Sequence, residues 1–252
     1  MTMTNIERSD LVFRKRAARL YVSTRQASMH RIVVLNSKGG SGKTTVATNM
    51  AAALASAGHS PALMDFDPQG SSMRWLERRE LSRRPIRGIA AYEVSGGVTR
   101  AYQLRSPQDC DYVVIDTPAA LDRTGLVEAT RGADSILIPV MPSAIDIHAA
   151  VKCISDLLLV SKLRHADRRV GIIANRVKSN TVVYQSLLKF INSLDIPLVA
   201  TLRDTQNYTS CFDRGIGVAE MPKWQARKDE ESVRSLVNWI RRNNQLESLC
   251  AS

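Results

Sequence analysis

The sequence NSKGGSGKTT at residues 36–45 decides the fold of this chain. An apolar run, IVVL at residues 32–35, precedes it, and an alanine-rich run that favours a helix follows at residues 46–57. A strand, a glycine-rich loop and a helix in this order form the context that a phosphate-binding loop requires. Glycines let the backbone approach phosphate oxygens that a Cβ atom would block, and backbone N–H groups at the helix start then converge on the anion. The stretch therefore predicts a phosphate site.

Two side chains complete the chemistry that this loop predicts. Lys43 is placed to reach the β- and γ-phosphates, and the Thr44 hydroxyl is placed to hold Mg²⁺. ATP and Mg²⁺ are therefore the cofactors that we expect. The residues expected to line the nucleotide within the loop are Lys38, Gly39, Gly40, Ser41, Gly42, Lys43, Thr44 and Thr45.

A second lysine narrows the interpretation. Lys38 precedes Lys43 by five residues, and Ser37 stands where the ordinary loop has its first glycine. The stretch KGGSGKTT resembles the deviant Walker A motif of the ParA/MinD ATPases, and in particular of the small ParA partition and cargo-positioning ATPases. In that family the early lysine reaches across a dimer to the nucleotide on the other subunit. The resemblance thus implies an ATP-dependent homodimer in which Lys38 acts in trans on catalysis.

Acidic residues follow two further apolar runs. Residues 62–66 read as a buried strand that leads into DFDPQG at residues 65–70, and residues 112–118 form an apolar strand that ends in Asp116. Carboxylates at the carboxyl ends of parallel strands beside a phosphate loop are well placed to act on Mg²⁺ or on a water molecule. The resemblance implies that Asp67 positions the attacking water, that Asp65 lies near the Mg²⁺ shell, and that Asp116 holds the metal as a Walker B acid.

The remaining pattern alternates strands and helices and predicts an α/β fold with a right-handed, doubly wound, mostly parallel sheet flanked by helices, as in P-loop NTPases. Further strands are expected at residues 89–94, 135–140, 170–177 and 196–202, and helices at residues 98–105, 145–163 and 229–243. By the resemblance, Asn175 at a strand exit contacts adenine. The segment 203–223 resembles the family region that combines base contacts with DNA-facing cations. The candidate DNA contacts are Arg203, Arg214 and Lys223, together with Arg74 and Arg78, which share a helix face.

Charge points to a polyanionic partner. The 252 residues carry a formal charge of +11, which a nucleotide-binding domain does not need for folding. We expect a short basic extension at residues 1–30, with an amphipathic helix at about residues 10–22, and an ATPase domain at residues 31–252. With 44% apolar residues the domain can bury a substantial core. Four scattered cysteines without a CxxC pair fit a reducing cytoplasm.

The function that the resemblance implies is a positioning ATPase in the cytoplasm. In the ATP state it would bind nonspecific DNA of the nucleoid, and an activating partner linked to the cargo would stimulate hydrolysis. The cargo in the family is a plasmid, a chromosome origin, a chemoreceptor cluster or a microcompartment. No apolar run approaches the length of a transmembrane helix, so we expect no stable membrane insertion.

Three alternatives use the same phosphate loop. A MinD-like membrane ATPase would need an amphipathic tail, but residues 243–250 contain one acid, no lysine and little apolar area. A nucleotide-dependent ligase would need a small acid as substrate. An iron–sulfur reductase would need cysteines on loops at the dimer axis, whereas Cys110 precedes a strand and Cys153 lies inside a predicted helix.

Overall fold

The computed structural model describes residues 29–92, 109–119, 121–160 and 169–250. Seven strands form one sheet in the order β3-β2-β4-β1-β5-β6-β7, and every pairing between them is parallel. The strands are β1 (His30–Val34), β2 (Pro61–Asp65), β3 (Arg87–Ala90), β4 (Tyr112–Asp116), β5 (Ser135–Val140), β6 (Val170–Val177) and β7 (Leu198–Arg203). The helices are α2 (Lys43–Ser56), α3 (Ser71–Glu77), α5 (Arg123–Thr130), α6 (Ala144–Val160), α7 (Val182–Asn192), α8 (Gln206–Asp213), η1 (Val218–Glu220) and α9 (Lys223–Cys250).

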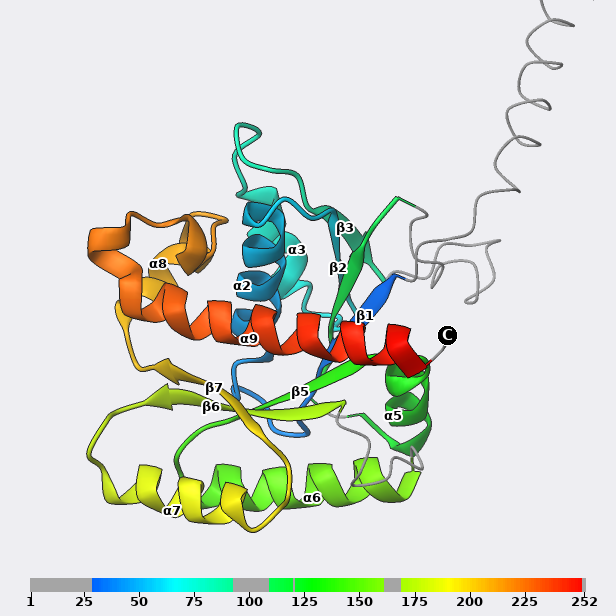
Figure 1. Ribbon diagram of the computed structural model, residues 1–252, viewed down its shortest axis with the longest axis vertical. Coiled ribbons are helices and arrows are strands. Elements are labelled where there is room, and N and C mark those ends of the chain that lie inside the picture. Colours follow the sequence, from blue (N-terminus) through cyan, green and yellow to red (C-terminus); the bar gives the residue numbers. More distant parts are fainter. Residues whose placement is uncertain (1–28, 93–108, 120, 161–168, 251–252) are drawn as a thin grey trace, which may run out of the picture.

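Helices cover both faces of the sheet (Figure 1). α2, α3, α8 and α9 pack on one face, and α5, α6 and α7 pack on the other. Strands β2, β4 and β5 are buried along their whole length, because a parallel sheet with helices on both faces exposes neither side to water. This arrangement confirms the predicted doubly wound sheet.

The glycine-rich loop leaves the carboxyl end of β1, the central strand of the sheet. β1 pairs with β4 on one side and with β5 on the other, so the ends of all three strands surround the loop. The alanines of α2 let this helix lie deep against the sheet, and most of its residues are buried. The sequence of β1, loop and α2 thus fixes the loop at the centre of the carboxyl edge.

Several predicted boundaries were wrong by a few residues, and the last helix by more. α9 begins at Lys223 rather than at residue 229, and it continues to Cys250. Asp229, the first residue of the predicted helix, lies inside α9, where it is fully buried and pairs with Arg203 of β7. The segment 203–223 is not an open loop, since it contains α8 and η1. The helices expected at residues 10–22 and 98–105 lie outside the described residues.

Candidate nucleotide-binding site

Two glycines of the loop adopt conformations that other residues rarely adopt. Gly40 has φ of 76° and Gly42 has φ of 96°, and Gly42 caps the amino end of α2. A Cβ atom on Gly42 would lie 2.0 Å from Nδ2 of Asn175, so this position has no room for a side chain. The left-handed turn directs backbone N–H groups at the start of α2 to one point, which is the geometry that binds phosphate.

Two asparagines hold the loop in this shape. Asn36 donates from Nδ2 to the carbonyl of Pro139 on β5 at 2.7 Å and accepts from the Lys38 amide at 3.0 Å. Asn175 at the end of β6 donates from Nδ2 to the carbonyl of Ser41 at 2.8 Å. Asn175 is 3% exposed, so in this structure its amide braces the loop rather than facing an open base site. The adenine contact that the resemblance implies for Asn175 stays a prediction.

Lys43 lies at the base of the loop. Its Nζ donates to the carbonyl of Lys38 at 3.3 Å, and the residue is 6% exposed. Burial lowers the pKa of the Lys43 ammonium, while the carboxylates of Asp116 and Asp67 oppose that shift. A buried cation with only a carbonyl acceptor would be stabilised by an anion in the loop. The position of Lys43 therefore fits the predicted contact with phosphate.

Asp116 offers a free oxygen beside this lysine. Its Oδ2 accepts a hydrogen bond from the Ser72 hydroxyl at 2.5 Å, whereas its Oδ1 is buried with no hydrogen-bond partner. Burial raises the pKa of Asp116 to about 6, and the nearby hydroxyls of Ser72 and Thr44 oppose the rise. A carboxylate next to a threonine hydroxyl is a set of hard oxygen donors, and Mg²⁺ binds such sets together with phosphate oxygens and waters. Thr44 and Asp116 thus fit Mg²⁺.

Asp65 lies directly across the sheet register from Asp116 but has different contacts. Its Oδ1 accepts from the Asp67 amide at 2.9 Å, and its Oδ2 accepts from the Ser72 amide at 3.0 Å. Burial raises the pKa of Asp65 while these backbone donors oppose the rise. The Asp65 carboxylate thus holds the turn that carries Asp67 and Ser72, and its place near the Mg²⁺ shell stays a prediction.

Asp67 is half-buried in that turn. Its Oδ1 accepts from the Gln69 amide at 3.0 Å, so the carboxylate is held by its own turn, and among the described residues it has no side-chain hydrogen-bond partner. The charge of Asp67 reaches Lys43 and opposes the lowering of its pKa. The geometry thus brings Asp67, Asp116 and Lys43 to one edge of the sheet.

Lys38 points away from its own phosphate loop. Its Nζ lies 2.9 Å from Oδ1 of Asp146, and the side chains are 29% and 4% exposed. Asp146 also accepts a hydrogen bond from the Ser143 hydroxyl, whose Oγ in turn accepts from the Asp146 amide at 3.2 Å. Sequence reasoning missed Asp146. The signal was the Ser-x-x-Asp spacing at the start of α6, which is typical of a helix amino terminus.

We expect Asp116→Asn to stabilise the nucleotide-free protein and to abolish Mg²⁺-dependent nucleotide binding. The pKa of about 6, against an ordinary value of 3.8, means that ionised Asp116 destabilises the fold at pH 7 by up to about 3 kcal/mol. This cost is present above the folded-state pKa and disappears below the unfolded-state pKa. The stability gain should therefore be measurable by thermal unfolding at pH 7 and should fade towards about pH 4.

A titration with a fluorescent ATP analogue, with and without Mg²⁺, measures the second effect. Asn keeps the shape of Asp and can accept from Ser72, so the variant should fold. A variant that is less stable than the parent at pH 7 would contradict the argument from burial.

The family model for the CobQ/CobB/MinD/ParA nucleotide binding domain matches residues 32–218. This chain belongs to that family. The match runs from within β1 to the first residue of η1 and includes the loop and the acidic residues of the candidate site. The deviant Walker A resemblance is thereby confirmed at the level of the family.

Curated relatives of this ParA/MinD-family protein include two proteins for maintenance of carboxysome distribution. The protein from Halothiobacillus neapolitanus is 26% identical over 213 residues, which cover 83% of this chain and 95% of the relative. The protein from Gloeobacter kilaueensis is 37% identical over 134 residues, or 53% of this chain and 59% of the relative. The chromosome-partitioning ATPase Soj of Thermus thermophilus is 27% identical over 188 residues, or 64% of this chain and 75% of the relative.

Solved structures share the fold. Apo McdA from Cyanothece aligns with a TM-score of 0.64 at 17% identity, covering 82% of this chain and 99% of that one. A partition protein from Borrelia burgdorferi bound to AMPPNP aligns with a TM-score of 0.65 at 16% identity, covering 84% and 99%. These likenesses confirm the seven-stranded ParA/MinD fold around the phosphate loop.

The structure gives the five predicted DNA contacts different surroundings. Arg203 makes a two-pronged ion pair with buried Asp229, at 3.0 and 2.9 Å, so its guanidinium has a structural role that the sequence did not show. Arg74 donates to the Gln69 carbonyl and to the Ser71 hydroxyl within its own turn. The others are more open: Arg78 lies 3.9 Å from Asp213 and over the ring of Phe212, while Arg214 and Lys223 are exposed.

Proposed function

We propose that this protein is an ATPase that dimerises around ATP–Mg²⁺, binds DNA without sequence preference in that state, and positions a partner-bound cargo. The observation that carries the proposal is the pair of lysines in one loop. Lys43 lies buried in its own loop, while Lys38 lies outside it on Asp146. A lysine held at the rim of the site is free to exchange a carboxylate partner for a phosphate on a second subunit.

The residues that act on ATP come from the ends of three strands. Backbone N–H groups of the loop and Lys43 would bind the β- and γ-phosphates, and Thr44 and Asp116 would hold Mg²⁺, which neutralises charge on the phosphates. Asp67 would orient and deprotonate the attacking water. Phosphoryl transfer depends mainly on positioning and on charge stabilisation, so turnover without Lys38 from a second subunit, or without an activating partner, should be slow.

We expect Asp67→Ala to bind ATP, dimerise and bind DNA normally, but to hydrolyse ATP at least about 100-fold more slowly in the presence of its partner. The reason is that Asp67 is held only by its own turn and contributes no contact to the core. Phosphate release in single-turnover experiments measures the effect, and Asp67→Asn tests whether the charge is needed. If both variants showed normal partner-stimulated turnover, a residue other than Asp67 would position the attacking water.

The outer face of α9 carries the most regular row of cations among the described residues. Lys223, Arg227, Arg234 and Arg241 follow one another at intervals of four, seven and seven residues, and all four are exposed. These intervals place them on one helix face, over about 27 Å of helix at 1.5 Å per residue. We name these four residues the α9 row. Of the four, only Arg227 has an ion pair in the described structure, with exposed Glu231 at 3.6 Å.

The α9 row, which includes the predicted contact Lys223, supports a DNA-binding role better than the other predicted contacts do. Each cation that neutralises a DNA phosphate releases counterions, so affinity rises steeply with the number of contacts and falls steeply with salt. A dimer presents two rows in one body, and the second row then binds at a high effective concentration. ATP-dependent dimerisation would thus convert weak binding into retention on the nucleoid.

The cargo class rests on the relatives. Two of them are named for carboxysome distribution, and others are named for chromosome partitioning. We propose that the cargo is a large cytoplasmic assembly of the microcompartment type, linked through an adaptor protein that stimulates hydrolysis. Release of the resulting ADP-bound monomer from DNA would then make the nucleoid a surface along which the cargo is distributed.

The decisive experiment is binding to random-sequence duplex DNA with ATP–Mg²⁺, with ADP–Mg²⁺ and without nucleotide, over a salt series. Tight binding only with ATP, with a steep salt slope and no sequence preference, is the expected result. Arg234→Glu should weaken binding, while Lys189→Glu, the same charge change on α7 across the sheet, should not. Equal binding in all three nucleotide states would contradict an ATP-gated DNA function.

Within the described residues, no helix is long and apolar enough to cross a membrane. A MinD-like surface contact with anionic lipid remains the second candidate, because the α9 row would also attract such a surface. Binding to vesicles with phosphatidylserine that survives an excess of duplex DNA would favour it over the proposal. A ligase role would show itself as ATP turnover that depends on a small carboxylic acid.

A further inference from the structure

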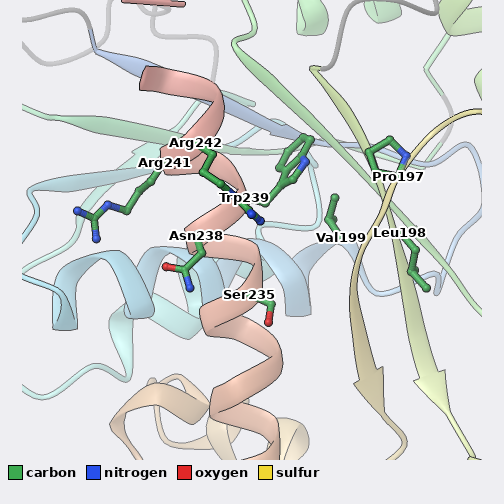
Figure 2. A pocket seen from close by; sticks show the side chains of 8 residues that line it. All are labelled: Pro197, Leu198, Val199, Ser235, Asn238, Trp239, Arg241 and Arg242. Atoms are coloured by element: carbon green, nitrogen blue, oxygen red, sulfur yellow. The ribbon is translucent and has the colours of Figure 1, made fainter. Parts of the chain in front are cut away.

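A groove of 610 Å³ lies between the amino end of β7 and residues 235–242 of α9 (Figure 2). One wall comes from the start of β7, which is the edge strand of the sheet. The other wall comes from α9, whose residues Ser235, Asn238, Trp239 and Arg242 follow the helical spacing of one face. The complete lining is Pro197, Leu198, Val199, Ser235, Asn238, Trp239, Arg241 and Arg242.

The floor of the groove consists of packed apolar side chains. Trp239 packs between α9 and Val199, as Figure 2 shows. A Cβ atom on Gly171 of β6 would lie 3.2 Å from the Trp239 ring and 2.7 Å from Val199, so the glycine makes room for this packing. Leu198 is 36% exposed beside it. The other side of the groove carries the polar and charged residues Ser235, Asn238, Arg241 and Arg242 of α9, so a ligand would meet both kinds of surface.

The rim is positively charged. Neither Arg241 nor Arg242 has a carboxylate within ion-pair distance among the described residues, and both are exposed. Two unpaired guanidinium groups beside an apolar floor favour a ligand that carries carboxylates as well as apolar side chains. Arginine also binds carboxylates through two parallel hydrogen bonds, which gives such a site geometric selectivity.

The charge of the longer segments outside the described residues does not suit this rim. Residues 1–28, 93–108 and 161–168 each contain more Arg and Lys than Asp and Glu. Like charges would oppose their entry beside Arg241 and Arg242. The partner must therefore be another molecule, and it must be acidic.

The shape of the groove favours an extended peptide. The face of α9 from Ser235 to Arg242 spans about 10 Å at 1.5 Å per residue, which matches about three residues of extended chain. An edge strand offers backbone N–H and C=O groups to an added strand, and side chains of that strand alternate between its two faces. A DNA duplex, by contrast, presents its phosphates on a broad convex surface that suits the exposed α9 row, of which only Arg241 also lines the groove.

We propose that this groove binds an extended acidic segment of a partner protein, added along the outer edge of β7. The groove lies at the amino ends of the strands, whereas the phosphate loop leaves the carboxyl end of β1. Dimerisation around ATP at the carboxyl edge therefore leaves it open. The partner segment binds equally in the ATP, ADP and nucleotide-free states, and it serves as a tether that hydrolysis does not release.

The test uses the full chain and a short fluorescein-labelled peptide of alternating glutamate and valine, followed by anisotropy in all three nucleotide states. Arg242→Glu should weaken peptide binding by about tenfold, the effect of losing one charge-assisted hydrogen bond. Arg234→Glu makes the same charge change on α9 outside the groove and should weaken it by less than about twofold, because salt screens exposed charges at this separation. Binding to duplex DNA should instead be weakened more by Arg234→Glu than by Arg242→Glu.

Control peptides separate strand addition from charge. A peptide with proline in place of valine keeps the carboxylates but loses the N–H donor at every second position, and proline does not fit inside a paired strand, so this peptide should not bind. The proposal is overturned if the proline peptide binds as well, if Arg242→Glu and Arg234→Glu weaken the peptide equally, or if no peptide binds. It is also overturned if Arg242→Glu weakens duplex DNA as strongly as Arg234→Glu, since the groove then belongs to the nucleic-acid surface.

Light scattering of Arg242→Glu tests whether a second copy of this chain occupies the groove. An unchanged oligomeric state excludes that copy, and a changed one would overturn the proposal. The outcome is separable from the proposed ATPase function. Peptide binding in all nucleotide states can hold when DNA binding shows no ATP dependence, and the reverse can hold as well. Unchanged thermal unfolding of both exposed-arginine variants confirms that they fold.

Discussion

Lys43→Ala should lose ATP binding altogether, with an affinity reduced at least about 100-fold, which corresponds to about 2.7 kcal/mol. Lys43 is the one buried ammonium at the loop, and its Nζ has only the Lys38 carbonyl as acceptor at 3.3 Å. Burial lowers its pKa, so the charge is poorly stabilised until an anion arrives. A phosphate would accept charge-assisted hydrogen bonds from the Lys43 ammonium, and alanine has no side-chain donor to make them.

The loss should not come from unfolding. Removing a partly desolvated cation relieves a cost, and the loop shape depends on Asn36, Asn175 and the glycines rather than on the lysine side chain. Isothermal titration with ATP–Mg²⁺ measures the affinity, and thermal unfolding checks the fold. Lys189→Ala on exposed α7 is the matched control and should bind ATP normally. If Lys43→Ala kept the ATP affinity of the parent, Lys43 would not contact the nucleotide as we propose.

Lys38→Ala should keep nucleotide binding and lose the ATP-dependent dimer. In this structure Lys38 pairs with Asp146 of its own chain at 2.9 Å and makes no side-chain contact inside the loop. Deleting it removes little from the nucleotide site of the same subunit. Deleting it does remove the group that we expect to reach the phosphates of a second subunit. Light scattering with ATP–Mg²⁺ should therefore report monomer, and titration should report unchanged ATP affinity.

A double variant separates the two roles of Lys38. The single variant leaves the Asp146 carboxylate, which is 4% exposed, without its cation, and we expect a loss of about 1–3 kcal/mol of stability. Lys38→Ala combined with Asp146→Asn removes the unpaired charge and should restore stability but not the dimer. An intact ATP dimer in either variant would rule out the action of Lys38 in trans.

The structure also gives some basic residues roles that the sequence did not reveal. Arg203 looked like a surface cation after a strand, but it neutralises Asp229 inside the protein. An ion pair between residues 26 positions apart depends on where α9 crosses β7, and a local pattern cannot show that crossing. The α9 row was readable in principle from its four- and seven-residue intervals, once the helix was known to begin at Lys223 rather than at residue 229.

The sequence by itself determined the phosphate loop, the parallel sheet and the acids at the carboxyl edge of that sheet. These follow from local physics: glycines that alone adopt the required turn, apolar runs that only a covered sheet can bury, and acids that end those runs. The tertiary structure alone decided that Asn175 braces the loop, that Asp146 holds Lys38, that Asp65 serves a turn, and that a groove forms beside β7. Each of these contacts joins segments that are distant in the chain. Their distances depend on how helices pack on the two faces of the sheet, which no single stretch of sequence encodes.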